Sequence, residues 1–334
     1  MSPDSKENQF SAYVRILGKG KTGSRSLNET EAYQAMRLIL AGEVADVQLG
    51  AFLMLLRVKE ESAEELAGFV SACREFIKKP KNAVNVDLDW SSYAGKRKQP
   101  HWFILSALLL AQSGIKIFMH GTAGHTEGRI YTASQLKELN IPIAKDLDQA
   151  NEYLAKNNFA FTPLGNFCNP LQRIIDLRPL FGLRSPVHTL CRLLNPLMAK
   201  ATLQSVFHPS YMTSHHDAAK LLGEQNAIVF KGDAGEVEYR PHASVKLKTL
   251  NQGTSHEITL DRHAEPPCAI SPDTERLTNL WKNSNSEALE PYGYNATIGT
   301  AAIALLAMGT ATDKNEAFEQ AKTLWRNRCK EQLV

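Results

Sequence analysis

The sequence predicts an α/β fold, with a small N-terminal helical domain beside a larger α/β domain that has a central, mostly parallel sheet. The first observation is that apolar residues recur at three- and four-residue spacing from about residue 10 to residue 79, as in amphipathic helices. The second is that this period changes after residue 83. Short alternating or apolar runs then precede a loop and a helix, which is the element order of parallel α/β units. We therefore expect domains at 1–80 and 81–334.

The helical segment contains recognisable starts for two of its helices. Asn28-Glu-Thr-Glu31 and Ser62-Ala-Glu-Glu65 are capping-box patterns, in which the first side chain and the glutamate satisfy each other's backbone N–H groups. Helices expected at about 170–200 join this segment. We expect it to pack against the rest of the chain or against a second copy.

The larger segment alternates strands and helices. Strands are expected at 84–88, 115–119, 159–162, 203–207 and 227–230, followed by a hairpin of 245–250 and 256–260. Helices are expected at 102–112, 132–139, 147–157, 171–181, 187–194, 211–222, 274–281, 296–308 and 314–330.

Composition indicates a soluble cytoplasmic protein. The 334 residues are 43% hydrophobic and 22% charged, which is ordinary for a globular chain. The five cysteines form no C-x-x-C pair, and the N-terminus has no apolar signal-peptide core. The longest apolar run, 103–111, is too short to span a bilayer, so no membrane contact is expected.

Two loops that follow predicted strands carry small and cationic residues. They are Asp89–Pro100 and His120–Arg129. Because ligands of α/β proteins gather at the carboxyl ends of strands, these loops predict a site for an anion.

A third basic loop, Gly18–Arg25, contains Gly-Lys-Thr but is not a nucleotide-triphosphate loop. Arg15 stands where that motif needs its first glycine, and a helix precedes the loop instead of a strand. Its lysines remain candidates for other phosphate contacts.

The order of segments resembles anthranilate phosphoribosyltransferase, whose fold is shared with the pyrimidine nucleoside phosphorylases. Ile39-Leu-Ala-Gly-Glu-Val44 and Gln48–Lys59 match the family's opening helices, and the resemblance runs from about residue 10 to residue 325. It implies a homodimer formed by the helical domain. It also implies an enzyme that joins phosphoribosyl pyrophosphate, held with magnesium, to anthranilate.

The chain departs from this family at the phosphate loop. Where the enzymes carry Gly-Thr-Gly-Gly-Asp around the pyrophosphate, Ser92–Gln99 has Gly95 as its single glycine and no aspartate. Glycines let backbone N–H groups meet phosphate at positive φ, so their loss damages the cradle. The family's Lys-His-Gly-Asn-Arg motif survives as Met119–Ala123, which keeps only His120 and Gly121.

Other family positions are kept in part. Arg178 matches the arginine that the family uses for the acceptor carboxylate, and Asn195 also remains. The magnesium-binding Asp-Glu pair falls on Val237-Glu238, so one carboxylate is missing and Glu238 is a vestige. Glu236 is the neighbouring carboxylate that would have to replace it. The histidines show no zinc-binding spacing, and we expect no metal or other cofactor.

These losses resemble a side branch of the family whose members keep the fold and the dimer, lack the biosynthetic activity and bind nucleic acid through a basic groove. The segments that match this branch are Tyr93–Gln99, Pro163–Cys168, Gly182–Ser185 and Gly235–Val237.

The preferred hypothesis is a dimeric protein without transferase activity that binds single-stranded DNA or RNA. Contacts to phosphates position a strand without reading its bases, so binding should be sequence-tolerant and salt-sensitive. The expected groove consists of Lys19, Lys21, Arg25, Lys96, Arg97, Lys98, Arg129, Arg178, Arg184 and Arg192. The expected vestigial substrate site consists of Gly95, His120, Gly121, Arg178 and Asn195. The candidates for stacking on bases are Trp90, Tyr93, Trp102 and Tyr131, and the alternative for each of them is packing in the core.

Two alternatives remain. One is an active phosphoribosyl or glycosyl transferase that uses magnesium, phosphoribosyl pyrophosphate and an anthranilate-like acceptor, held by Arg178 and Glu238. The other is a scaffold that docks partners on its helical domain. The sequence does not determine the choice between DNA and RNA or any acceptor.

Overall fold

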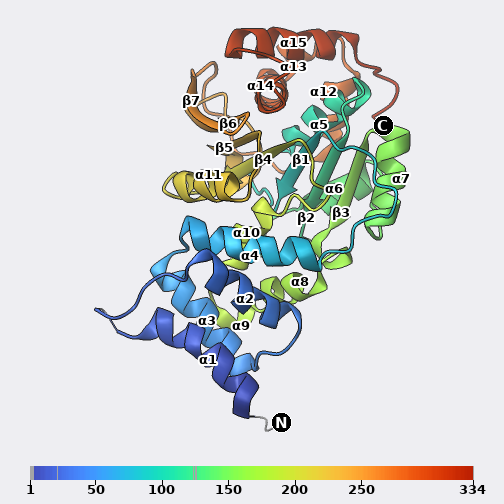
Figure 1. Cartoon of the computed structure of the whole chain (residues 1–334). Helices are drawn as coiled ribbons and strands as arrows, with labels where there is room; N and C mark the ends of the chain where they lie inside the picture. Colours follow the sequence, from blue (N-terminus) through green and yellow to red (C-terminus); the bar gives the residue numbers. More distant parts are fainter. Residues whose placement is uncertain (1–3, 21, 123, 125, 334) are drawn as a thin grey trace.

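Four N-terminal helices pack together on one side of the larger domain (Figure 1). The computed structural model describes residues 4–20, 22–122, 124 and 126–333. The four helices are α1 (Asp4–Gly18), α2 (Glu29–Leu40), α3 (Asp46–Lys59) and α4 (Ala63–Phe76). Both predicted capping boxes form, because Asn28 accepts from the N–H of Glu31 and Ser62 accepts from that of Glu65.

The central sheet has seven strands in the order β3-β2-β1-β4-β5-β6-β7. They are β1 (Leu88–Ser92), β2 (Ile117–Gly121), β3 (Phe159–Pro163), β4 (Ala201–Val206), β5 (Ala227–Lys231), β6 (Val245–Asn251) and β7 (Thr254–Leu260). The first five are parallel, and the last two form the predicted antiparallel hairpin. This sheet beside a helical domain confirms the predicted fold class. The strand order reverses between β1 and β4, so the carboxyl ends of these strands form the topological switch point.

Helices cover both faces of the sheet (Figure 1). On one face α5 (Trp102–Gln112) packs against α14 (Pro291–Ala307), and almost every side chain of both helices is buried. The remaining helices are α6 (Thr132–Glu138), α7 (Leu147–Asn157), α8 (Asn169–Asp176), α9 (Arg178–Phe181), α10 (Val187–Leu190), α11 (Tyr211–Leu221), α12 (Thr274–Lys282), α13 (Ser286–Leu289) and α15 (Lys314–Asn327). The 3₁₀ turns are η1 (Leu164–Asn166), η2 (Cys191–Leu193) and η3 (Asp233–Gly235).

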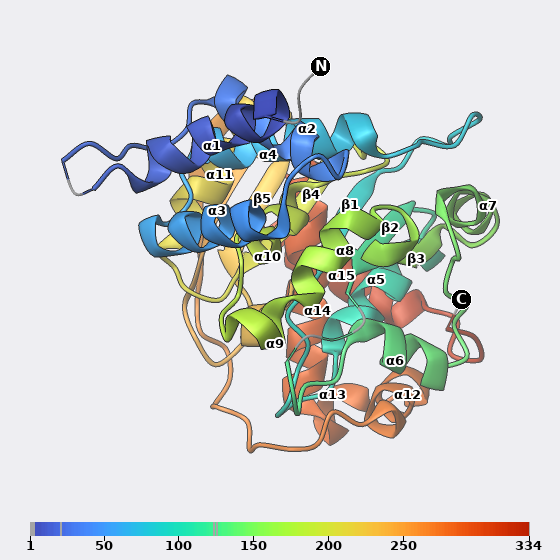
Figure 2. The same cartoon turned by 90° about the horizontal axis from the view of Figure 1, so that it is seen from below.

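The segment that contains α8 and α10 packs with the N-terminal helices. Leu171, Ile174 and Leu190 lie in the same apolar cluster as Phe52 and Leu66. Figure 2, seen from the side of the helical region, shows α8 and α10 next to that region. Residues far apart in the sequence therefore share one apolar cluster.

Several element boundaries differ from prediction, and two of the differences are large. The first strand begins at Leu88 instead of residue 84, because backbone pairing with β2 begins with Leu88 opposite Ile117. Since β1 ends at Ser92, the loop that starts at Tyr93 directly follows the strand. Helix α14 begins at Pro291, ahead of the predicted residue 296, since proline fits the first turn of a helix. Within the described residues, no helix combines the length and apolarity needed to cross a membrane.

Candidate functional site

A pocket of about 210 Å³ lies at the switch point, where the loops after β1 and β4 meet. Tyr93 follows β1, and Phe207 and His208 follow β4; all three line the pocket. The segment 184–192 contributes further lining side chains, and Arg57 reaches the pocket from α3 of the helical region. The pocket is therefore enclosed by both parts of the molecule.

Beside this pocket, a carboxylate of the chain caps the loop that follows β1. Glu236 is fully buried and accepts hydrogen bonds from the backbone N–H groups of Ala94 at 2.7 Å and Gly95 at 2.5 Å. It also accepts from Ser92 Oγ at 2.8 Å. This is the loop in which the family's motif would hold pyrophosphate. Its N–H groups are thus already satisfied by an internal anion.

A buried ammonium group lies between two further carboxylates. Lys96, 1% exposed, donates to Glu238 and lies 2.9 Å from Asp233 Oδ2. Burial by itself lowers the pKa of Lys96, but the two neighbouring carboxylates outweigh it and raise the pKa overall. Lys96 was expected to line an open groove, and that expectation is wrong because its charge is enclosed. The ammonium takes the place that a cation would take beside Glu238.

Two arginines tie the same loops together. Arg129 donates from one nitrogen to the carbonyl oxygens of Ala94, Gly95 and Ala234, at 2.9–3.1 Å. Arg192, 8% exposed, donates to the carbonyls of Ser205 at 3.0 Å and Gly235 at 2.9 Å. Both were expected to meet nucleic acid. Their main contacts instead join the loops after β1 and β5 and the end of β4.

Arg178 and Arg184 converge on Thr126. Arg178 donates to the Thr126 hydroxyl, and a guanidinium nitrogen of Arg184 lies 3.5 Å from the same oxygen. Burial, and then the charges of Arg129, Arg178 and Arg192, lower the pKa of Arg184 to about 10. Arg184 makes no ion pair with any described carboxylate. The place is therefore rich in positive charge and favours an anion.

His120, which the chain shares with the family's motif, is part of a buried polar chain. Its Nδ1 lies 2.7 Å from the Tyr93 hydroxyl and its Nε2 lies 3.2 Å from Asp89 Oδ2. His120 and Asp89 are almost completely buried. These contacts fix the hydroxyl end of Tyr93, so that its ring is what reaches the pocket.

The other predicted vestigial residues shape the backbone. Gly121 lies so close to β1 that a Cβ would stand 2.1 Å from the Ser92 carbonyl oxygen. Gly95 has φ +67°, and a Cβ there would stand 2.8 Å from the Ile130 oxygen. Asn195 is buried and holds the following turn, accepting from Ala199 N at 2.7 Å. Asn195 thus does not face the pocket described above.

The four aromatic residues proposed to stack on bases are buried. Trp90 and Trp102 are 0% exposed, and Tyr93 and Tyr131 are 2% and 3% exposed. Trp90 stacks on Phe103 within the core. These rings pack inside the domain, which is the alternative to stacking that the sequence left open. Tyr93 alone of the four lines the pocket.

The remaining predicted cations lie on two exposed loops. Arg97 and Lys98 are exposed and form no ion pair within the described chain. Lys19 is exposed on the loop between α1 and α2, which projects from the helical region (Figure 1). Arg25 is exposed but is held by both carboxylate oxygens of Glu31, at 2.6 and 2.7 Å. Lys21 lies outside the described residues.

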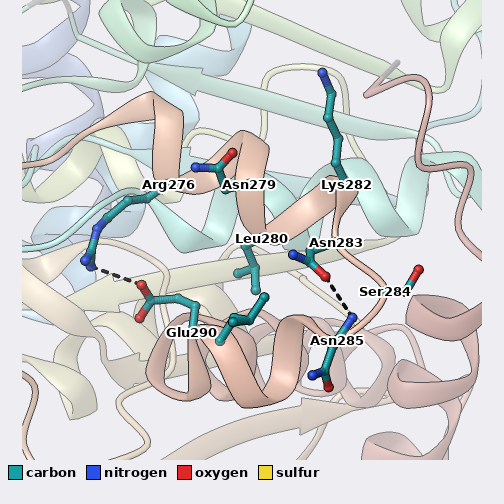
Figure 3. A pocket seen from close by; sticks show the side chains of 9 residues that line it. Arg276, Asn279, Leu280, Lys282, Asn283, Ser284, Asn285 and Glu290 are labelled. Atoms are coloured by element: carbon teal, nitrogen blue, oxygen red, sulfur yellow. Dashed lines mark hydrogen bonds and ion pairs between the residues drawn. The ribbon is translucent and has the colours of Figure 1, made fainter.

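A roomier hollow of about 730 Å³ lies between α12 and α13 (Figure 3). Arg276 at its edge pairs with Glu290 at 3.0 Å, and Asn283 and Asn285 bond to each other. Arg276 and Glu290 thus match each other's charge. The hollow also lies on the side of the larger domain away from the helical region (Figure 1).

The described residues contain no group of three or more His, Cys, Asp or Glu side chains arranged to hold a metal ion. Asp233 and Glu238 are the carboxylates that come together at the expected position, and Lys96 lies between them. Glu236, considered as a substitute ligand, faces the loop N–H groups instead.

Sequence reasoning missed the pairing of Lys96 with Asp233 and the capping role of Glu236. One signal was present: Gly232 and Gly235 flank the turn. A Cβ at Gly232 would stand 1.8 Å from the backbone carbonyl oxygen of Glu236, and Gly235 has φ +91°. A turn this tight places Glu236 against its neighbours. Arg57 was also missed, because nothing local links α3 to the sheet.

The chain matches two models of one protein family. Residues 13–77 match the helical bundle domain of the glycosyl transferase family, and residues 104–327 match that family's α/β domain. Uncharacterized protein YbiB of Escherichia coli is 29% identical over 245 residues, covering 72% of this chain and 75% of that protein. Anthranilate phosphoribosyltransferase of Novosphingobium aromaticivorans is 28% identical over 312 residues, covering 88% and 91%.

Solved structures show the same fold. Anthranilate phosphoribosyltransferase from Thermus thermophilus superposes with a TM-score of 0.80 at 21% identity, covering 95% of this chain and 94% of that one. The Saccharomyces cerevisiae enzyme in complex with PRPP and Mg gives a TM-score of 0.76 at 17% identity, covering 97% and 94%. At such identities the likeness concerns the fold alone.

Proposed function

The chain belongs to the glycosyl transferase family that includes anthranilate phosphoribosyltransferase, and from this we propose that it has lost phosphoribosyl transfer and binds single-stranded DNA or RNA. The observation that carries the proposal is the internal occupation of the substrate site. Glu236 accepts from the N–H groups of Ala94 and Gly95, and Lys96 pairs with both Asp233 and Glu238.

The loss of transfer follows from competition with these internal groups. A metal-bound pyrophosphate would have to displace the Glu236 carboxylate from Ala94 and Gly95 and the Lys96 ammonium from its carboxylates. All of these groups are buried, and separating a buried ion pair is strongly unfavourable. The site therefore resists the ligand that the family's motif would bind.

Binding of nucleic acid is supported by the cations that remain accessible. Arg97 and Lys98 extend from the loop after β1, and Arg184 carries a charge without an acidic partner in the described chain. Guanidinium and ammonium groups bind phosphates and release counterions, so affinity should fall with salt. Arg184 lines a narrow pocket, which suits a single strand better than a duplex.

A homodimer through the helical region remains part of the proposal. Val47 on α3 and Leu180 on α9 are 80% and 83% exposed, and large exposed apolar side chains favour association. Sedimentation velocity of the full chain would give the oligomeric state, and a monomer at all concentrations would contradict the dimer.

The test of strand binding uses the exposed loop. Arg97→Ala/Lys98→Ala should weaken binding of a single-stranded oligonucleotide and flatten the plot of log affinity against log salt by about 1.4, at roughly 0.7 per lost phosphate contact. The control is Lys145→Ala/Lys156→Ala, which removes two exposed cations beside α7. Equal effects of the two pairs, or an unchanged slope, would contradict the groove.

The test of lost transfer is calorimetry. Phosphoribosyl pyrophosphate with Mg²⁺ should give no saturable heat at millimolar concentration. A saturable binding curve, followed by product formation with anthranilate, would favour the alternative of an active transferase.

A further inference from the structure

The pocket at the switch point has the size of a site for one ring. Its volume of about 210 Å³ is below the roughly 300–1,000 Å³ of pockets that enclose drug-sized ligands. Tyr93, His188, Phe207, His208 and Tyr211 give it an aromatic lining, in which Phe207 and His208 are the exposed rings. Flat aromatic surfaces of this kind receive bases by stacking, and they do so independently of base identity. The pocket thus suits a planar ring, and it is too small for a length of strand.

His215 offers a hydrogen-bond acceptor at this pocket. Its Nδ1 lies 3.0 Å from Gln204 Oε1. Because an amide oxygen only accepts, Nδ1 carries the hydrogen and Nε2 carries a lone pair. Burial and the charge of Arg192 lower the pKa of His215 to about 3, so it stays neutral. Neutral imidazoles accept from the amino and N–H groups on the edges of nucleobases.

The rim of the pocket supplies positive charge. Arg57 and Arg184 line it, and no Asp or Glu is among the described lining residues. Arg57 donates to the Tyr211 hydroxyl at 3.2 Å, and that hydroxyl donates to Glu60 at 3.2 Å. The other guanidinium donors of Arg57 could bind a ligand. Arg184 lies among three other arginines. A phosphate attached to the ring's sugar would meet these two guanidinium groups.

We infer that this pocket is a subsite for a single nucleotide, in which one unstacked base of the bound strand enters beside Tyr93 and its phosphate meets Arg57 and Arg184. The inference rests on the proposed binding of single strands and deepens it. Exposed cations on the loop at Arg97 would hold the backbone, while the pocket holds one base. Removing a base from a duplex costs a few kcal/mol, and this cost is smallest for a base that is already single-stranded. The subsite therefore also accounts for a preference for single strands.

The experiment separates the ring from the phosphate. Calorimetry of the full chain with AMP and CMP should give measurable binding, whereas ribose 5-phosphate should bind at least tenfold more weakly because it lacks a ring. Thr189→Trp, on α10 at the pocket, should fill the space and reduce AMP affinity at least tenfold. It should also lower oligonucleotide affinity several-fold without changing the salt slope. Thr213→Trp on the exposed side of α11 is the matched control.

A second variant tests the pocket without filling it. His215→Phe keeps a ring but removes the acceptor, so AMP affinity should fall about threefold to tenfold while thermal unfolding shows a folded protein. This readout supports the subsite even if Thr189→Trp disturbs the fold.

The outcomes distinguish the two proposals. Salt-dependent strand binding with no mononucleotide binding, or with equal affinity for ribose 5-phosphate and AMP, would overturn the subsite and leave the proposed function standing. Binding of AMP that Thr189→Trp abolishes, without any strand binding, would support a nucleotide pocket and contradict the proposed function.

Discussion

The two sides of the pocket at the switch point differ in whether their charged groups are paired within the chain. On the side of β5, Glu236 meets backbone N–H groups and Lys96 meets Asp233 and Glu238. On the side of the helical region, Arg184 lies among other arginines and has no acidic partner in the described residues. Buried charges that are matched within the chain stabilise the fold and need no ligand. A charge crowded by like charges lowers stability unless an anion binds. The contrast indicates that the ligand of this protein binds on the arginine side.

The largest effect should come from breaking the matched side. Lys96→Ala removes the cation from two buried carboxylates and should lower the free energy of unfolding by roughly 3–5 kcal/mol. Lys96→Met keeps most of the volume but still leaves the carboxylates unpaired. Urea unfolding followed by circular dichroism measures the change. Lys98→Ala, on the exposed part of the same loop, is the control. If both alanine variants are equally stable, the contacts of Lys96 with Asp233 and Glu238 do not stabilise the fold.

A buried carboxylate that is poorly matched sharpens the comparison. Glu61 is 5% exposed, and its Oε2 has no partner in the described chain. Burial, opposed mainly by a backbone hydrogen bond and by Arg57, raises the pKa of Glu61 to about 7 from 4.5. The folded state therefore keeps the proton longer than the unfolded state. The stability that this group contributes is present below about pH 4.5 and is lost as the pH rises to about 7.

Glu61→Gln should remove this pH dependence. At pH 8 the variant should be more stable than the natural chain by up to roughly 3 kcal/mol, and at pH 4.5 the two should agree. Urea unfolding at both pH values is the measurement, with Glu64→Gln on the exposed face of α4 as the control. A natural chain that gains stability between pH 4.5 and pH 8 relative to Glu61→Gln would contradict the assignment.

Arg184→Ala tests the unmatched side. It should weaken oligonucleotide binding by roughly 1–1.5 kcal/mol, about fivefold to tenfold, because a charged hydrogen bond to phosphate is lost. Stability should stay within about 0.5 kcal/mol of the natural chain or rise slightly, since like-charge crowding is relieved. Fluorescence anisotropy and thermal unfolding measure the two quantities, and Lys246→Ala on β6 is the control. A large loss of stability would mean that Arg184 holds the fold.

Periodicity was sufficient to predict the fold class and most elements. The helical spacing before residue 79 and the strand, loop and helix order after it depend on local side-chain patterns, which report burial directly. The first strand was displaced because residues 84–88 alternate like a strand while pairing with β2 begins only at Leu88. Local pattern does not specify the partner strand.

The site was less predictable, because charge does not reveal its partner. Lys96, Arg97 and Lys98 are adjacent in sequence, yet Lys96 is buried and the other two are exposed. What separates them is Asp233 and Glu238, more than 130 residues away along the chain. Residue type indicated an anion site, and long-range packing decided which cations remain available to it.

The smallest effect should come from Arg25, whose charge is matched on the surface. Both oxygens of Glu31 hold its guanidinium, and exposed pairs of this kind contribute little. Arg25→Ala should therefore change oligonucleotide affinity by less than about twofold. Glu31→Gln is the more telling variant, because glutamine can still complete the capping box with Asn28 while releasing Arg25. If matching is what keeps this loop from binding, Glu31→Gln should raise affinity and steepen its salt dependence, as measured by anisotropy. Arg25→Ala could instead lose as much affinity as Arg184→Ala. That result would show that pairing with Glu31 does not prevent Arg25 from binding the strand, and the difference in charge pairing between the two sides of the pocket would then not explain where the strand binds.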